Sequence, residues 1–168
     1  REPVPLTAAW VDIGFEQRTV LGVCGRYRRL GFPAVFGCKG ASNLRYNAKG
    51  RHVLRRRYGV DFRATEGDRW FMQVSDIWKE RAQRAFLAEP LVGGSLSLFG
   101  ADPRRHGAFA DEICAEILAD KVKDSRGVDW YKWNQRPGVG NHWLDTTAGC
   151  FAMASWYGLL DDDAAVAA

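Results

Sequence analysis

The chain has 168 residues, 46% of them hydrophobic and 26% charged, with a net charge of +4, which is an ordinary composition for one globular domain. It has no signal-like apolar stretch and no run of about 20 apolar residues, so the sequence predicts no membrane span. The four cysteines are widely separated and only three histidines are present, which argues against a zinc knuckle or a dense disulfide frame and predicts free thiols in a reducing cytoplasm.

The first half of the chain alternates strand-like and helix-like patterns. Leu21 and Cys24 recur at helical spacing, and Gly31 followed by Pro33 ends that helix. The elements predicted here are a strand at 7–13, a helix at 17–30, a strand at 34–38, a strand at 70–74 and a helix at 77–87. On the last helix, the side chains expected to face solvent are Lys79, Glu80, Gln83 and Arg84.

The second half begins after helix-breaking residues at 90–94. Segment 112–123 fits either a helix continued from His106 or a strand, and the alternation of apolar and acidic residues favours a strand for its later part. The remaining predicted elements are that strand, its hairpin partner at 128–133, and a closing helix from an N-cap at Asn141 to about Leu160. This order of elements predicts one α/β domain.

Charge is distributed unevenly along the chain. Residues 1–60 contain twelve Lys or Arg and three acidic residues, a net charge of +9, so the remainder carries −5. The densest basic stretch, 49–58, mixes arginines with an aromatic residue between two expected strands, where a loop would reach a phosphate backbone. Its candidate DNA-binding residues are Arg51, Arg55, Arg56 and Arg57. The alternative is an ordinary solvated surface loop.

Three aspartates are the strongest functional signal in the sequence. Asp12 and Asp76 each follow an apolar and aromatic run that is typical of a buried strand, where an unpaired carboxylate is costly. Asp145 begins the closing helix, and small residues in the next turns would let that helix approach a sheet closely. Any one of these aspartates alone is more often a helix cap or a turn residue. Their three placements together predict one acidic cluster.

An acidic cluster of this kind suits divalent ions. Oxygen ligands favour Mg²⁺, for which Mn²⁺ is the expected substitute. In phosphoryl-transfer sites two such ions sit about 3.5–4 Å apart, activate a water and stabilise the leaving oxygen. We therefore expect Asp12, Asp76 and Asp145 to be catalytic residues and ligands of two ions. Lys79 is expected either to neutralise phosphate charge or to be solvated, and His142 either to carry a proton or to be an ordinary surface histidine.

Four stretches, taken together and in order, carry a resemblance to a known family. They are Trp-Val-Asp-Ile-Gly at 10–14, Val-Phe-Gly-Cys-Lys-Gly at 35–40, Val-Ser-Asp-Ile-Trp-Lys-Glu-Arg at 74–81 and Asn-His-Trp-Leu-Asp at 141–145. They resemble, respectively, the Asp-Ser-Gly strand end, the strand ending in Lys-Gly, the Val-Asp-x-x-Lys-Asp turn and the Asn-x-x-Leu-Asp of one nuclease family. That family is the nuclease domain of the large terminase subunit of tailed phages, in particular its lambda-type branch.

The resemblance implies a ribonuclease-H-like fold, with a mixed central sheet flanked by helices. It implies a Mg²⁺- or Mn²⁺-dependent endonuclease of phage genome packaging, in the cytoplasm of the host cell and away from any membrane. The implied partners are double-stranded DNA, the ATPase motor domain of the same subunit, the small terminase subunit and the portal. Because the chain starts at Arg1 and contains no G-x-x-x-x-G-K-[ST] loop, we expect a single nuclease domain, residues 1–168, from a longer protein whose motor is absent here.

The family pattern is not matched at every position. Ile13 stands where the family has a small polar residue, and His142 and Trp143 are bulkier than the residues usual there. One alternative function is a catalytically inactive DNA-binding module of a packaging or recombination protein, in which the acids are caps. Another is a nuclease of the restriction-enzyme type, but residues 129–132 have one residue too many between acid and lysine for its hairpin motif.

Overall fold

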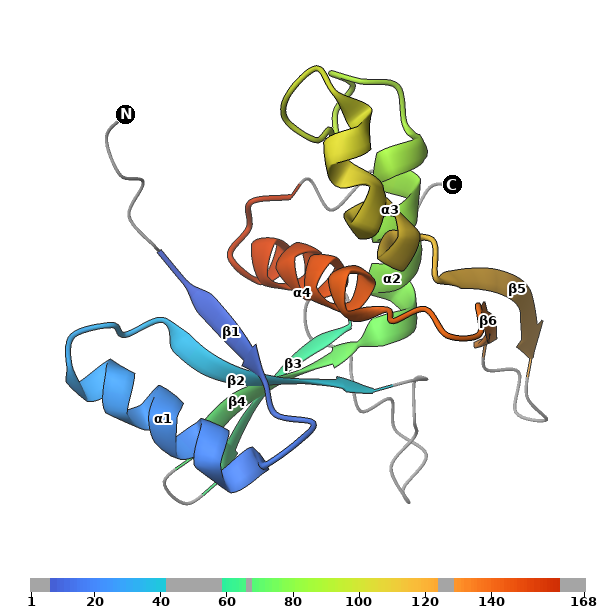
Figure 1. The fold of residues 1–168 in the computed structure, drawn as a ribbon. Coiled ribbons are helices and arrows are strands. Elements are labelled where there is room, and N and C mark those ends of the chain that lie inside the picture. The colour runs from blue at the N-terminus through green and yellow to red at the C-terminus, as the bar shows by residue number, and fades with distance from the viewer. Residues whose placement is uncertain (1–6, 42–58, 66–67, 124–128, 161–168) are drawn as a thin grey trace.

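The structure, a computed structural model, describes residues 7–41, 59–65, 68–123 and 129–160 of the chain. It contains a four-stranded sheet with helices on both faces and a separate two-stranded hairpin (Figure 1). The elements in chain order are β1 (Ala9–Asp12), α1 (Gln17–Arg29), β2 (Val35–Ala41), β3 (Val60–Thr65), β4 (Asp68–Val74), α2 (Ser75–Leu87), the 3₁₀ turn η1 (Pro103–His106), α3 (Gly107–Ile113), β5 (Glu116–Lys123), β6 (Asp129–Gln135) and α4 (His142–Trp156).

The main sheet is mixed. Its strand order is β1-β2-β4-β3, in which β1, β2 and β4 run parallel and β3 pairs antiparallel with β4. In this register Asp12 lies beside Cys38, and Cys38 lies beside Phe71. α1 lies against one face of the sheet, whereas α2 and α4 lie on the other side (Figure 1). This arrangement confirms the predicted α/β class with a mixed sheet flanked by helices.

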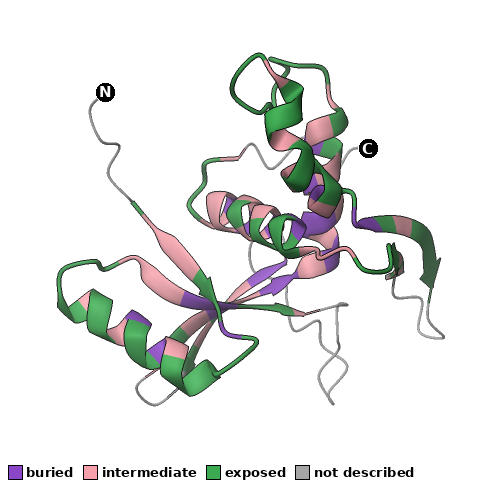
Figure 2. Cartoon of the chain, in the orientation of Figure 1, coloured by how far each residue is buried: buried purple, intermediate pink, exposed green. Residues whose placement is uncertain are grey.

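The core between the sheet and α4 is built around Phe71 of β4. Its ring stacks on Trp10 at a centroid distance of 4.3 Å and meets Trp156 edge-on at 4.9 Å. Ala148 and Ala152 of α4 are buried in the same cluster, because their small side chains let the helix lie close to the sheet. Figure 2 shows buried residues along α2, α4 and the middle of the sheet. The prediction that small residues bring the closing helix onto the sheet is confirmed.

The opposite face of the sheet is covered by α1, and Gly37 of β2 makes room for it. α1 buries Leu21 and Cys24, and Ile13, just after β1, has no exposed surface. A Cβ atom at Gly37 would lie 2.7 Å from both Ile13 Cγ2 and Leu21 Cδ2. Glycine at this position therefore allows the side chains under α1 to reach the strand backbone.

Three elements differ from the sequence-based expectations. The sequence predicts no strand at 60–65, where the structure has β3, an edge strand whose first residue, Val60, is fully buried. Asp76 does not end a strand, because β4 stops at Val74 and Asp76 is the second residue of α2. α4 ends at Trp156 rather than near residue 160. The predicted strand and hairpin in the second half are confirmed as β5 and β6.

Two further expectations concern the membrane and the cysteines. Within the described ranges, no helix has the length and apolar character needed to cross a membrane. All four cysteines are free thiols, as predicted, and Cys24 and Cys38 are the buried ones.

Gly37→Ala is expected to destabilise the fold, because the new methyl group would crowd Ile13 and Leu21 between α1 and the sheet. Overpacking of this kind typically costs about 1–3 kcal/mol in the free energy of unfolding. Gly22→Ala on the exposed side of α1 is the matched control, since a Cβ there meets no atom within 4 Å. Replacing a helical glycine by alanine is expected to stabilise by about 0.5–1 kcal/mol. Urea unfolding measures both variants, and a shift of the same sign for both would contradict the close packing at Gly37.

Candidate active-site cleft

A cleft of about 510 Å³ lies at the carboxyl-terminal edge of the parallel strands. β1, β2 and β4 end there, and α2 and α4 begin there. This is the edge at which open α/β sheets usually bind ligands. The cleft is lined by all three predicted site aspartates, which we call the aspartate triad, and by both predicted auxiliary residues: Asp12, Asp76, Asp145, Lys79 and His142. The structure therefore brings together side chains that are far apart in the sequence.

Asp12, the last residue of β1, is exposed to the cleft. Its Oδ1 accepts a hydrogen bond from the Gly14 backbone N–H at 3.1 Å, which orients the carboxylate at the strand end. Cys38 lies beside it on β2. Burial, and secondly the negative charge of Asp12, raise the pKa of Cys38 to about 12, because both disfavour the thiolate. Cys38 is therefore a protonated thiol at neutral pH.

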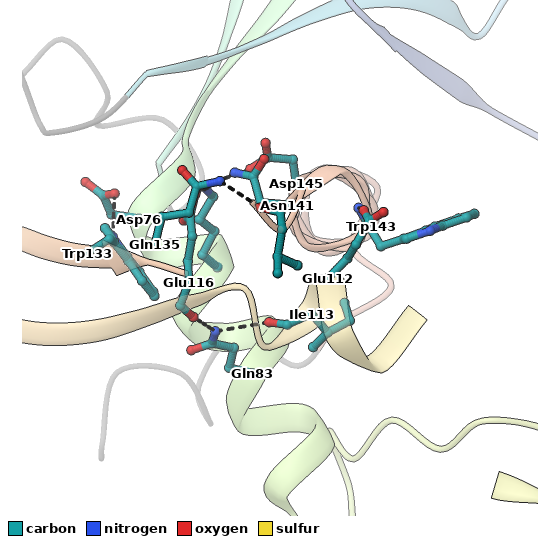
Figure 3. A network of polar contacts seen from close by, with 12 residues as sticks. Asp76, Gln83, Glu112, Ile113, Glu116, Trp133, Gln135, Asn141, Trp143 and Asp145 are labelled. Atoms are coloured by element: carbon teal, nitrogen blue, oxygen red, sulfur yellow. Dashed lines mark hydrogen bonds and ion pairs between the residues drawn. The ribbon is translucent and has the colours of Figure 1, made fainter. Parts of the chain in front are cut away.

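Asp76 lies in the first turn of α2, with only 3% of its surface exposed. Its Oδ1 accepts a hydrogen bond from the indole Nε1–H of Trp133 at 2.8 Å (Figure 3). Trp133 belongs to β6, so the hairpin reaches the beginning of α2. The free backbone N–H groups of a first helical turn also favour a negative charge there. The structure holds this carboxylate in a defined orientation with little access for solvent.

Lys79 lies one turn after Asp76 and is 9% exposed. Its Nζ is 2.8 Å from Asp145 Oδ1 and 2.7 Å from Glu116 Oε2. The expectation that Lys79 faces solvent is wrong, because this side of α2 meets the start of β5 and the first turn of α4. Burial alone lowers the pKa of Lys79, but the hydrogen bonds and charges of Asp145 and Glu116 outweigh it, so the pKa is raised above its ordinary value. Lys79 is a fixed positive charge in the wall of the cleft.

Glu116, the first residue of β5, is the site residue that the sequence does not reveal. It is 7% exposed, and its Oε2 and Oε1 accept hydrogen bonds from Lys79 at 2.7 Å and from Asn141 Nδ2 at 2.5 Å. Its backbone carbonyl accepts a hydrogen bond from Gln83 at 2.6 Å (Figure 3), so Gln83 does not simply face solvent either. Alternation in a half-buried strand would turn Glu116 outward, yet it is Ile117 that is exposed. No local pattern marks this reversal, because the partner Lys79 sets it.

Asn141 precedes α4 at the N-cap position, as predicted, but its side chain does not cap the helix. It donates instead to Glu116, and the Asn141 backbone carbonyl accepts the Asp145 N–H at 2.9 Å. The first turn of α4, which carries Asp145, is therefore tied to the start of β5. His142 is exposed and lines the cleft.

The cleft suits a hard cation in the chemistry of its donors, because the aspartate triad supplies carboxylate oxygens. Gln73 lines the same cleft, and its buried Oε1 has no hydrogen-bond partner in the described part of the chain. Among the residues that the structure describes, however, no three His, Cys, Asp or Glu side chains form a group that could hold a metal ion. Lys79 binds Asp145, so this carboxylate would have to exchange the ammonium for an ion.

The predicted DNA-binding residues fall outside the described ranges: Arg51, Arg55, Arg56 and Arg57. Among described residues, the basic side chains that line the cleft are Lys79 and Lys39. Lys39 is exposed near the end of β2. Through Lys39, the basic half of the sequence contributes positive charge to the cleft.

Asp12→Asn is expected to make Cys38 react faster with iodoacetamide, because loss of the negative charge lowers the pKa of Cys38 and raises its thiolate fraction. Cys38 stays buried in the variant, so its labelling remains slower than the labelling of the exposed Cys114. Peptide mass spectrometry of the folded protein gives the rates, with the buried Cys24 as internal reference. Asp120→Asn on the exposed side of β5 is the control. An unchanged ratio of Cys38 to Cys24 labelling would contradict the proximity of Asp12 to Cys38.

Comparison with known proteins identifies no relative of this chain. No protein-family model, no curated protein and no solved structure matches the chain. The residues of the cleft, together with the resemblance of the four sequence stretches, are therefore what bears on function.

Proposed function

We propose that this chain is a metal-dependent DNA endonuclease of phage genome packaging, with a ribonuclease-H-like fold. The observation that carries the proposal is the meeting of the aspartate triad in one cleft at the carboxyl edge of the parallel strands. The mixed sheet flanked by helices supports the fold assignment. Three of the four stretches that resemble terminase nucleases each contain one aspartate of the triad, and the fourth contains Lys39.

Asp12, Asp76 and Asp145 would hold the ions, Mg²⁺ or its substitute Mn²⁺. When bound, two such ions activate a water and stabilise the leaving 3′ oxygen of a phosphodiester. The protein orients the ligands: the Trp133 indole fixes Asp76, and the Lys79 ammonium fixes Asp145 until an ion replaces it. Loss of an outer-shell hydrogen bond of this kind typically lowers metal affinity or activity by about 10–100-fold.

Two side chains beside the triad would act on the phosphate and the proton. Lys79 presents a buried ammonium next to Asp145, and a preorganised charge in a poorly solvated wall stabilises developing negative charge better than a solvated one. His142 is exposed at the start of α4 and lines the cleft, where its imidazole would carry a proton to or from the reacting groups.

Double-stranded DNA is the proposed substrate because its phosphates complement the basic half of the chain. Residues 1–60 carry a net charge of +9, and Lys39 from this half lines the cleft. The residues proposed to bind phosphates beyond the cleft are Arg51, Arg55, Arg56 and Arg57. The resemblance adds the ATPase motor domain, the small terminase subunit and the portal as proposed partners in the host cytoplasm.

A second candidate function is a DNA-binding module that does not cut. The observation that favours it is the absence, among the described residues, of a group that could hold a metal ion, together with the Lys79–Asp145 pair that neutralises one triad member. A Mn²⁺ titration separates the two functions, since the inactive module would bind DNA but no ion.

The purified chain is expected to nick supercoiled plasmid in Mn²⁺ or Mg²⁺ with little sequence preference, and a chelator is expected to stop it. Asp12→Asn, Asp76→Asn and Asp145→Asn should each lower the cleavage rate by more than about 100-fold, since even outer-shell partners of metals typically contribute 10–100-fold. Asp120→Asn, outside the cleft, should cut like the parent. Plasmid left intact by the folded parent in Mn²⁺ would refute the activity, and parental cutting by any triad variant would remove that aspartate from the site.

Replacing Arg55, Arg56 and Arg57 together by Ala is expected to weaken DNA binding and to flatten its salt dependence. The slope of log affinity against log salt should fall by about 0.9 for each phosphate that the variant no longer neutralises. Fluorescence anisotropy over a range of salt concentrations measures this, and Arg104→Ala with Arg105→Ala in η1 controls for a general decrease in positive charge. If the triple variant keeps the parental affinity and slope, the 49–58 segment does not bind DNA.

A further inference from the structure

Glu116 touches the cleft residues without lining the cleft itself. Lys79 of α2 lines the cleft, and Glu116 contacts both Lys79 and Asn141, the residue before α4 (Figure 3). We propose that Glu116 is a positioning residue that acts through Lys79 and Asn141 to keep Asp145 available for a divalent ion. This inference rests on the metal-dependent function proposed above.

The Glu116 carboxylate is held at both of its oxygens. Oε2 accepts the Lys79 hydrogen bond from α2 at 2.7 Å, and Oε1 accepts the Asn141 hydrogen bond from the start of α4 at 2.5 Å. The backbone carbonyl of the same residue is held by Gln83 at 2.6 Å. A carboxylate with both oxygens and its own backbone engaged has little freedom to reorient, so it defines where the Lys79 ammonium lies.

Lys79 is shared by two carboxylates that differ in exposure. The side chain of Glu116 is 10% exposed, whereas that of Asp145 is 51% exposed. A cation in the cleft therefore reaches Asp145 and not Glu116. When Asp145 turns to the ion, Lys79 keeps Glu116 as its counter-charge, and no buried charge is left unpaired.

Without the Glu116 charge, Asp145 would be the only carboxylate opposing the Lys79 ammonium among the described residues. Turning Asp145 toward an ion would then leave a buried ammonium without a counter-charge, which is unfavourable. The ion-free pair would be favoured, and the affinity for the ion would fall. Glu116 therefore sets the balance between the ion-free and ion-bound arrangements of Asp145.

Glu116→Gln tests the inference, because it keeps the shape and an acceptor for Asn141 but removes the charge. We expect the Mn²⁺ affinity of the metal-free chain, measured by isothermal titration calorimetry, to fall by about tenfold or more, which corresponds to ~1.4 kcal/mol. Glu112→Gln is the matched control: it removes the same charge at the same end of α4, where Glu112 accepts the Trp143 N–H at 3.0 Å. Glu112→Gln should change the Mn²⁺ affinity by less than about threefold, because a charge outside the cleft is screened by the solvent.

The double variant Lys79→Met with Glu116→Gln removes both charges and releases Asp145, so its Mn²⁺ affinity is expected to return to the parental value or above. Thermal melts of the metal-free proteins establish that each variant folds. Where Glu116→Gln does not fold, Asn141→Ala takes its place, because it removes only the second hydrogen bond to the Glu116 carboxylate. Asn141→Ala should lower the Mn²⁺ affinity of the parent, but by less than the roughly tenfold decrease expected for Glu116→Gln.

The outcomes distinguish this inference from the proposed function. A parent that binds no Mn²⁺ refutes the metal-dependent function and the inference together. A parent that binds Mn²⁺, with unchanged affinity in Glu116→Gln or Asn141→Ala, overturns the inference alone and leaves Glu116 a purely structural residue. An equal decrease in Glu112→Gln, or no recovery in the double variant, also overturns it, since the effect would then not pass through Lys79.

Discussion

The arrangement of the cleft depends on one buried cation, the Lys79 ammonium. A buried charge is unfavourable unless it is paired, and Lys79 is paired twice, with Glu116 of β5 and Asp145 of α4. Because Lys79 itself belongs to α2, this single group links two helices and the hairpin. The sheet supplies the edge at which the cleft forms, and the ion pairs of Lys79 connect the elements that form its walls.

The elements with regular apolar spacing, and the meeting of the aspartates, could be predicted from the sequence. The helix expected at 17–30 is α1, because Leu21 and Cys24 both turn toward the sheet. Asp12 follows a parallel strand, and Asp76 begins the helix after another parallel strand. Parallel strands end at one edge of a sheet and the following helices start there, so chain order alone placed these two carboxylates near each other.

The surroundings of the aspartates could not be predicted, because they depend on partners distant in the sequence. Lys79 lies among polar neighbours on its helix and so had the pattern of a solvent-facing residue, yet Glu116, 37 positions later, buries it. Glu116 faces inward against the apolar alternation of its own strand for the same reason. The edge strand β3 was missed because it follows the basic segment directly, although Val60, Phe62 and Ala64 alternate with polar residues as in a half-buried strand. The role of that basic segment stays a prediction, since it lies outside the described residues.

The hairpin of β5 and β6 meets α2 through polar pairs, in contrast to the aromatic packing that joins the sheet to α4. Lys121 and Glu80 approach to 2.7 Å, Trp133 and Asp76 to 2.8 Å, and Glu116 and Lys79 to 2.7 Å. Of these three contacts, the Lys121–Glu80 pair is the exposed one, and an exposed ion pair weakens as ionic strength rises. Screening therefore acts mainly on the exposed Lys121–Glu80 pair and much less on the buried Glu116–Lys79 pair. The hairpin is thus held on α2 by a buried ion pair that salt screens little and by an exposed pair that salt weakens.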